Sequence, residues 1–259
     1  MENNIAKAHA RFELNIPAAM LDQLVKTLEN LQPIALSEIE REDLPNGAGV
    51  YQLIHKKQIV YTGKSDGNIV HRLQRHRLAL SGRRNIAVKD ITFRYITLSD
   101  FWDPVIPETS LIDHFVKDES VSWNRTGYGS NDPGRNREMT EVNSFDLQHP
   151  VDSSFKLATL KSGEYSVNEY LQWIKKELPY TFRYYTDNPK SWQTGSKMYN
   201  DLRIKHDAAQ VTASSVIVNV ARQLQEGTGK PWQATALPPR IILYPEEGIE
   251  YPQGEVLYP

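Results

Sequence analysis

The spacing of hydrophobic residues predicts a helix near the start of the chain. In residues 17–31, PAAMLDQLVKTLENL, apolar residues recur every three or four positions, so one helical face carries Leu21, Leu24, Val25, Leu28 and Leu31. Pro17 precedes this pattern, and proline is well suited to the first turn of a helix. We therefore predict an N-terminal helical segment within residues 1–45.

The next part of the chain shows the alternation typical of strands. VYQLI (50–54) and QIVYT (58–62) predict a hairpin that follows a Pro- and Gly-rich stretch at 45–49. A helix capped by Asp66 or Asn68 is predicted to run to about Leu80 and to stop near Gly82. ITFRYI (91–96) then predicts a third strand.

Further along, the pattern predicts a helix from Pro107 through ETSLIDHF and a long loop at 123–137, which is rich in Gly, Asn, Asp and Pro. Beyond residue 150, amphipathic helices are predicted in SVNEYLQWIKKEL (166–178) and DAAQVTASSVIVNVARQLQ (207–225). Prolines divide residues 238–259, which predicts short edge strands or an extended arm. We expect an α+β fold with two regions: a small antiparallel three-stranded sheet flanked by helices (46–150) and an additional α+β region (151–259).

Composition excludes several kinds of chemistry. The chain has no cysteine, so disulfide bonds, thiolate catalysis and cysteine-ligated zinc are excluded, and any metal must bind oxygen or imidazole. The first 14 residues lack the apolar core of a signal peptide, and no run of about 18 apolar residues occurs. We therefore expect a cytoplasmic protein without a membrane partner.

Charge is unevenly distributed along the chain. The net charge of −2 would argue against a nucleic-acid partner. Between Lys56 and Arg94, however, the sequence has ten Lys or Arg residues and only two acids. This segregation leaves a basic region in which phosphate groups could bind.

A set of polar and aromatic residues in this region forms a recognisable motif. Gly49-Val50-Tyr51 and Tyr61-Thr62-Gly63, followed by Lys64, lie one on each strand of the predicted hairpin. Alone, such residues also suit the core of any hairpin. Arg72 and His76, four apart and therefore on one helical face, come next, followed by Glu108 and then by Asn124 after Trp123.

In this order the residues resemble the functional residues of the GIY-YIG nuclease superfamily. The Arg-x-x-x-His spacing, the Glu before LIDHF, the Trp-Asn pair and the loop GYGSNDPGRNR are similar to its type II restriction endonuclease branch. The resemblance implies an Mg²⁺-dependent endonuclease, for which Mn²⁺ would substitute, that cuts double-stranded DNA at a short palindromic site. With one active site per chain, cutting both strands implies a homodimer.

The resemblance also implies roles for these residues. Glu108 would be the metal ligand, because one carboxylate with water and phosphate oxygens suits Mg²⁺; otherwise it is an ordinary helix-start glutamate. Tyr51 would take the proton from the attacking water, with Tyr61 beside it. Since a tyrosine pKa near 10 is too high for this task, Lys64 is expected to lower it.

Three further residues complete the implied site. Arg72 would neutralise the phosphate oxygens, or else lie on a solvated helix face. His76 would hydrogen-bond the scissile phosphate or Tyr61, or belong simply to a basic face. Asn124 would tie the metal region to the backbone, or be a turn residue.

Other basic residues are candidates for DNA contacts. Phosphate contacts, which fix register without reading sequence, are expected from Arg75, Arg77, Arg83, Arg84 and Lys89. Loop arginines are candidates for reading guanine in the major groove, although such residues are more often merely solvated; they are Arg125, Arg135 and Arg137.

Two other functions stay open at this point. A structure-specific repair or mobile-element nuclease would cut branched DNA, and a catalytically inactive relative would only bind DNA. Residues 151–259 carry no motif, and they serve either target recognition or dimerisation, or else form a structural extension. The aromatic and basic residues of TFRYYTDNPKSWQTGSKMYNDLRIKH (181–206) fit a DNA-reading surface, although aromatic residues of this kind more often belong to a core.

Overall fold

The computed structural model describes residues 12–13, 15–98, 114, 122–129, 138–140, 142–188 and 195–259. The chain forms two compact units, one of residues 1–72 with 91–122, the other of residues 73–90 with 123–259. Their boundary falls inside helix α2 (Ile69–Ser81), so the first turn of this helix belongs to the first unit and the rest to the second.

The first unit contains an antiparallel sheet in the order β1-β4-β2-β3. Its strands are β1 (Ile34–Ala35), β2 (Gly49–His55), β3 (Gln58–Ser65) and β4 (Ile91–Thr97). The turn of the β2–β3 hairpin is formed by Lys56 and Lys57, both with positive φ, as a tight turn between twisted strands requires. The predicted hairpin and third strand are confirmed, and the two-residue β1 adds a strand that was not predicted.

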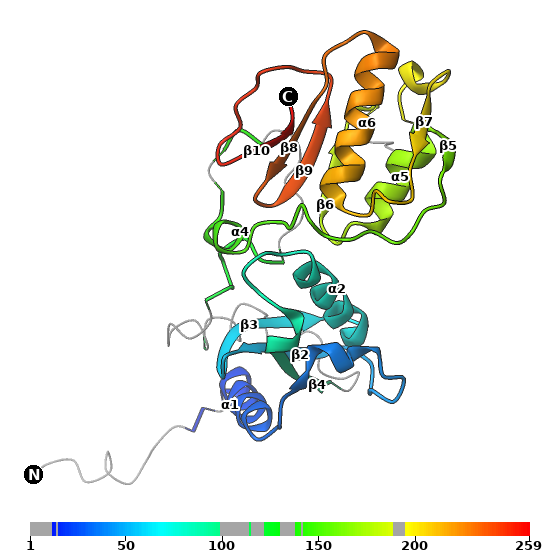
Figure 1. Cartoon of the computed structure of the whole chain (residues 1–259). Coiled ribbons are helices and arrows are strands. Elements are labelled where there is room, and N and C mark those ends of the chain that lie inside the picture. Colours follow the sequence, from blue (N-terminus) through cyan, green and yellow to red (C-terminus); the bar gives the residue numbers. More distant parts are fainter. Residues whose placement is uncertain are drawn as a thin grey trace, which may run out of the picture. The chain divides into compact units, whose positions relative to one another are not determined.

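Helix α1 (Ile16–Glu29) lies against one face of this sheet (Figure 1). Leu24, Val25 and Leu28 pack with Val50 of the sheet, as the apolar stripe predicted. Asn15 caps the helix by accepting a hydrogen bond from the backbone N–H of Ala18. A 3₁₀ helix, η2 (Leu36–Glu40), follows β1.

Of the two predicted caps of α2, Asn68 makes the contact: its Oδ1 accepts from the backbone N–H of His71 at 2.7 Å. The helix ends at Ser81, as predicted, and a short 3₁₀ helix, η3 (Val88–Asp90), precedes β4.

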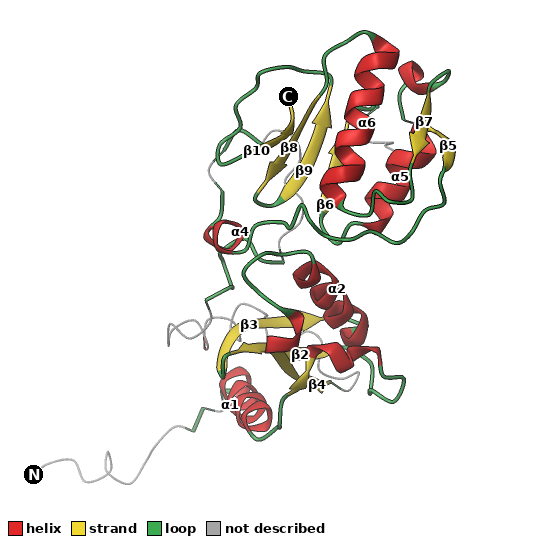
Figure 2. Cartoon of the chain, viewed as in Figure 1, coloured by secondary structure: helices red, strands yellow, loops and turns green. Residues whose placement is uncertain are grey.

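The second unit contains a four-stranded sheet in the order β10-β8-β9-β6 and a separate two-stranded sheet, β5–β7 (Figure 2). The strands are β5 (Gly163–Ser166), β6 (Thr181–Tyr184), β7 (Arg203–His206), β8 (Gln233–Leu237), β9 (Arg240–Tyr244) and β10 (Glu255–Tyr258). The helices are α4 (Ser144–Gln148), α5 (Val167–Glu177), η6 (Lys197–Tyr199) and α6 (Ala213–Thr228). Capping boxes begin α5 at Ser166 and α6 at Thr212.

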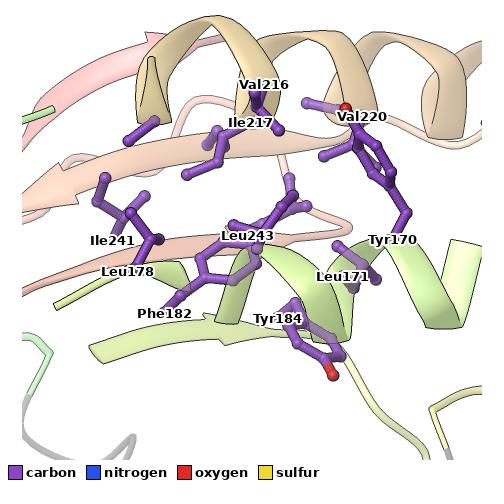
Figure 3. Packing of buried hydrophobic residues seen from close by; sticks show 14 of the residues in the cluster. Tyr170, Leu171, Leu178, Phe182, Tyr184, Val216, Ile217, Val220, Ile241 and Leu243 are labelled. Atoms are coloured by element: carbon purple, nitrogen blue, oxygen red, sulfur yellow. The ribbon is translucent and has the colours of Figure 1, made fainter. Parts of the chain in front are cut away.

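The core of the second unit lies between these helices and the large sheet. In Figure 3, Leu171 of α5 and Ile217 of α6 lie close to Phe182 of β6 and Leu243 of β9. The two amphipathic helices are thus confirmed, and the aromatic residues Phe182 and Tyr184 belong to the core.

The prediction that residues 238–259 form only edge strands or an arm is wrong for β9. This strand lies between β8 and β6, with all its residues buried. Prolines flank it at Pro239 and Pro245 without interrupting its backbone N–H groups, so it can pair on both sides. β10 does lie at the edge of the sheet.

Two predicted segments, the helix from Pro107 to Phe115 and the loop from 130 to 137, fall on residues outside the described ranges, apart from His114. Within the part of the chain that the structure describes, no helix is both long enough and apolar enough to cross a membrane.

Candidate active site

The β2–β3 hairpin brings Tyr51 and Tyr61 to one face of the sheet. Tyr51 pairs with Gly63, and Leu53 pairs with Tyr61. Because directly opposed residues of an antiparallel pair share a face, both tyrosine rings leave the sheet on the same side. Their centroids are 6.0 Å apart, and both side chains are buried.

Packing explains why the two glycines of the motif are needed. A Cβ at Gly63 would lie 2.5 Å from the Cζ and Oη atoms of Tyr51 and 2.8 Å from Cε1 of Tyr61. A Cβ at Gly49 would overlap the backbone carbonyl oxygen of Ile96. Gly63 therefore provides the space that the two rings occupy, and Gly49 allows β2 and β4 to approach.

Arg72, at the start of α2, contacts this pair. Its Nε donates a hydrogen bond to the Tyr51 hydroxyl at 3.3 Å. Arg72 is half-buried, so the structure places the permanent cation against the candidate base within the first unit. Helical spacing puts His76 one turn further along the same helix.

The expected effect of Lys64 on Tyr51 is not what the structure shows. Burial raises the pKa of Tyr51 above its ordinary value, and the group that opposes this rise is Arg72. Lys64 pairs with Val50 across the hairpin, so strand alternation directs it to the face opposite Tyr51. The ammonium of Lys64 forms an ion pair with Asp66 at 2.7 Å.

His76 and Asn124 belong to the second unit, and both are buried. The His76 ring stacks on Tyr128, with centroids 5.2 Å apart and 24° between the ring planes. Asn124 lies in the turn segment 122–129. Tyr128 was not predicted as a site residue, although an aromatic residue inside a segment rich in Gly and Asn was a usable signal.

The arginines predicted to bind DNA fall into different environments. Arg75 and Arg125 are exposed, and Arg77 is partly buried. Arg83, in contrast, is largely buried: its side chain is 14% exposed, and its Nη1 lies 2.7 Å from the Asp146 carboxylate. Arg84 donates to the backbone carbonyl of Val151 and pairs with Glu255.

The contacts of Arg83 are those of a residue that stabilises the fold, in place of the expected phosphate contact. The same Nη1 also donates to the backbone carbonyls of His149 and Pro238. Lys89 is exposed, and its contact with a phosphate stays a prediction. Arg135 and Arg137 lie outside the described residues.

Glu108, the predicted metal ligand, also lies outside the described residues. Within the described ranges, no three His, Asp or Glu side chains gather as a metal site would require. The donor types still fit a hard cation, since the chain has no cysteine and the candidate ligand is a carboxylate.

Comparison with known families gives one finding. A family model described as the Eco29kI GIY-YIG domain matches residues 46–176, which include the hairpin, α2 and the segment around Asn124. A search of curated proteins gave no match.

Proposed function

The chain belongs to the Eco29kI GIY-YIG family of type II restriction endonucleases, and we propose that it is a site-specific, Mg²⁺-dependent endonuclease. Its proposed substrate is double-stranded DNA with a short palindromic site. The observation that carries the proposal is the contact between Arg72 and Tyr51, two motif residues that are far apart in the sequence.

The proposed reaction is hydrolysis of a phosphodiester bond. The oxygen of a water molecule forms a bond to phosphorus and loses a proton, while the bond to the leaving oxygen breaks and that oxygen takes up a proton from the solvent. Tyr51 is proposed to accept that proton at its hydroxyl oxygen when it is in the phenolate form, which the hydrogen bond from Arg72 favours. Arg72 is also suited to neutralise the phosphate oxygens, since its guanidinium is always charged.

Glu108 would hold the Mg²⁺ ion, which would neutralise charge on the phosphate and on the leaving oxygen. His76 is proposed to hydrogen-bond a phosphate oxygen, and Asn124 is proposed to support the metal region. Lys64 is given no part in this step, because strand alternation directs it to the face of the sheet opposite Tyr51.

The palindrome and the homodimer are proposed together. One active site per chain cuts one strand, so two copies related by a two-fold axis would cut both strands of a symmetric site. Analytical ultracentrifugation of the purified protein, alone and with a duplex oligonucleotide that contains the cleavage site, would test the homodimer. A monomer in both samples would refute it.

Residues 151–259 are proposed to contribute to target recognition or dimerisation as part of the second compact unit, which also includes residues 73–90 and 123–150. The β9 strand and the aromatic residues of β6 support the interior of this region, so any DNA contact must come from its surface.

The central experiment is incubation of plasmid DNA with the purified protein and Mg²⁺. Discrete bands support site-specific cleavage, whereas a smear refutes it. Cleavage of branched DNA alone would favour a structure-specific nuclease, and specific binding without cleavage would favour an inactive relative.

Variants then test the named residues. Glu108→Ala should abolish cleavage and preserve binding. Arg72→Gln should slow the single-turnover step, whereas Arg75→Gln, which changes an exposed arginine of the same helix that is expected to contact a DNA phosphate, should weaken DNA binding and leave that step nearly unchanged. Equal effects of the two arginine variants would contradict the special role of Arg72.

A further inference from the structure

A buried aromatic cluster lies next to His76 in the second unit. We use this name for the four residues Trp123, Tyr128, Phe145 and His149. Phe145 contacts the other three rings, and Tyr128 lies 4.6 Å from the Phe145 ring and 5.0 Å from the Trp123 ring, measured between centroids. One side of Tyr128 is stacked on His76.

The backbone around Tyr128 is held in place. Gly127 has a φ of +96°, and a Cβ there would meet the side chain of Asn143 at 2.5 Å. The carbonyl oxygen of Thr126 accepts from the N–H of Phe145 in α4 at 3.3 Å. The segment that carries Tyr128 is therefore bonded to α4 through Thr126 and packed at Gly127 against Asn143, the residue that precedes this helix.

A buried cation supports the other side of the cluster. The guanidinium carbon of Arg83 lies 5.6 Å from the centre of the Phe145 ring, within the range of a cation–π contact. Arg83 is in turn paired with Asp146. The ring of Tyr128 therefore packs against Phe145, and Phe145 in turn contacts the guanidinium of Arg83, which the ion pair with Asp146 keeps in place.

This arrangement restricts the orientation of the imidazole. Hydrogen bonds of an imidazole lie in the plane of its ring, so stacking on one ring face restricts them to a single plane. Since His76 is buried, it has little other freedom to turn.

We propose that Tyr128 is a positioning residue for His76: its ring fixes the plane of the imidazole, so that a ring nitrogen is directed at the substrate phosphate. This inference rests on the proposed function, and it assigns a role to a residue outside the motif. The aromatic ring carries the role, and the hydroxyl does not.

Single-turnover cleavage and DNA-binding measurements on variants test it. Tyr128→Leu and Tyr128→Met each remove the ring, and either one suffices if the other does not fold. We expect cleavage to fall about 10- to 100-fold with unchanged DNA affinity, because a small misplacement of a reacting group has costs of this order. Tyr128→Phe should keep cleavage within about threefold of the wild type.

A double-variant cycle separates positioning from general destabilisation. If Tyr128 acts through His76, then His76→Ala combined with Tyr128→Leu should be no slower than His76→Ala alone. The inference would be overturned if the rate reductions of the two single variants multiplied in the double variant, or if His76→Ala cleaved DNA as fast as the wild type.

An NMR measurement that does not depend on cleavage separates the test of Tyr128 from the test of the proposed function. The ring current of Tyr128 should shift the NMR signals of the His76 imidazole protons upfield in the wild type and in Tyr128→Phe, and Tyr128→Leu should lose the shift. A protein that cuts no DNA would refute the proposed function, whereas an unchanged signal in Tyr128→Leu would refute the positioning.

Discussion

Substituting alanine for Gly63 would test the geometry of the candidate site most directly. The new Cβ would lie 2.5 Å from the Tyr51 hydroxyl, whereas an ordinary contact begins at 3.4 Å. Tyr51 must therefore move by about 1 Å, because the facing residue in the hairpin is the tyrosine itself. That movement would disturb its hydrogen bond with Arg72.

The two expected effects have different magnitudes. Overpacking of a buried site typically costs about 1–3 kcal/mol of the free energy of unfolding. Displacement of a catalytic group by about 1 Å is expected to slow the chemical step by about 100-fold. Gly63→Ala should thus lose much more activity than its loss of stability explains, because a protein of this size remains folded after a loss of that order.

The assay is single-turnover cleavage of the plasmid fragment at a temperature at which the variant is folded, paired with urea unfolding. Gly67→Ala is the matched control, since a Cβ at Gly67 meets nothing within 4 Å. If Gly63→Ala cut DNA as fast as Gly67→Ala, the position of Tyr51 would not limit catalysis, and its role as the base would be refuted.

Three other outcomes are expected. Because burial raises the pKa of Tyr51 above its ordinary value, its phenolate is scarce at neutral pH, and the single-turnover rate should rise about tenfold per pH unit with no plateau below the ordinary tyrosine pKa of about 10; a flat profile would exclude it as the base. Asp146→Ala leaves the Arg83 charge buried and should cost about 3–5 kcal/mol in urea unfolding, whereas Glu255→Ala, which breaks the exposed pair with Arg84, should cost less than about 1 kcal/mol. EDTA should stop cleavage and added Mg²⁺ or Mn²⁺ should restore it; persistent cleavage in EDTA would contradict a metal mechanism.

Local patterns predicted the elements of this fold well, because the predictive signals act over a few residues. The hairpin, the stripe of α1 and the amphipathic patterns of α5 and α6 arise from neighbours in sequence. The position of β9 was missed because a proline-flanked run of apolar residues reads the same at an edge and in the centre of a sheet. Only the pairing of β9 with β6, some 60 residues earlier, distinguishes the two.

The candidate site was predictable as a set of residue types, since Tyr51, Tyr61 and Arg72 do meet. The roles of Lys64 and Arg83 were not predictable from their charge. Lys64 is directed away by strand alternation, and Arg83 is drawn inward by Asp146, which is 63 residues further along the chain. The number of basic residues in a segment indicates neither the direction of Lys64 nor the ion pair of Arg83.

The boundary inside α2 limits how this enzyme can be rebuilt. Residues 82–84, just after the helix, bond to Pro150, Val151 and Asp152 and, through Arg83, to Pro238 near the end of the chain. In a chimera joined at residue 150, residues 82–84 would come from one parent, and most of the residues to which they bond would come from the other. Recombination between related nucleases should therefore succeed only when residues 73–90 are inherited together with everything after Trp123.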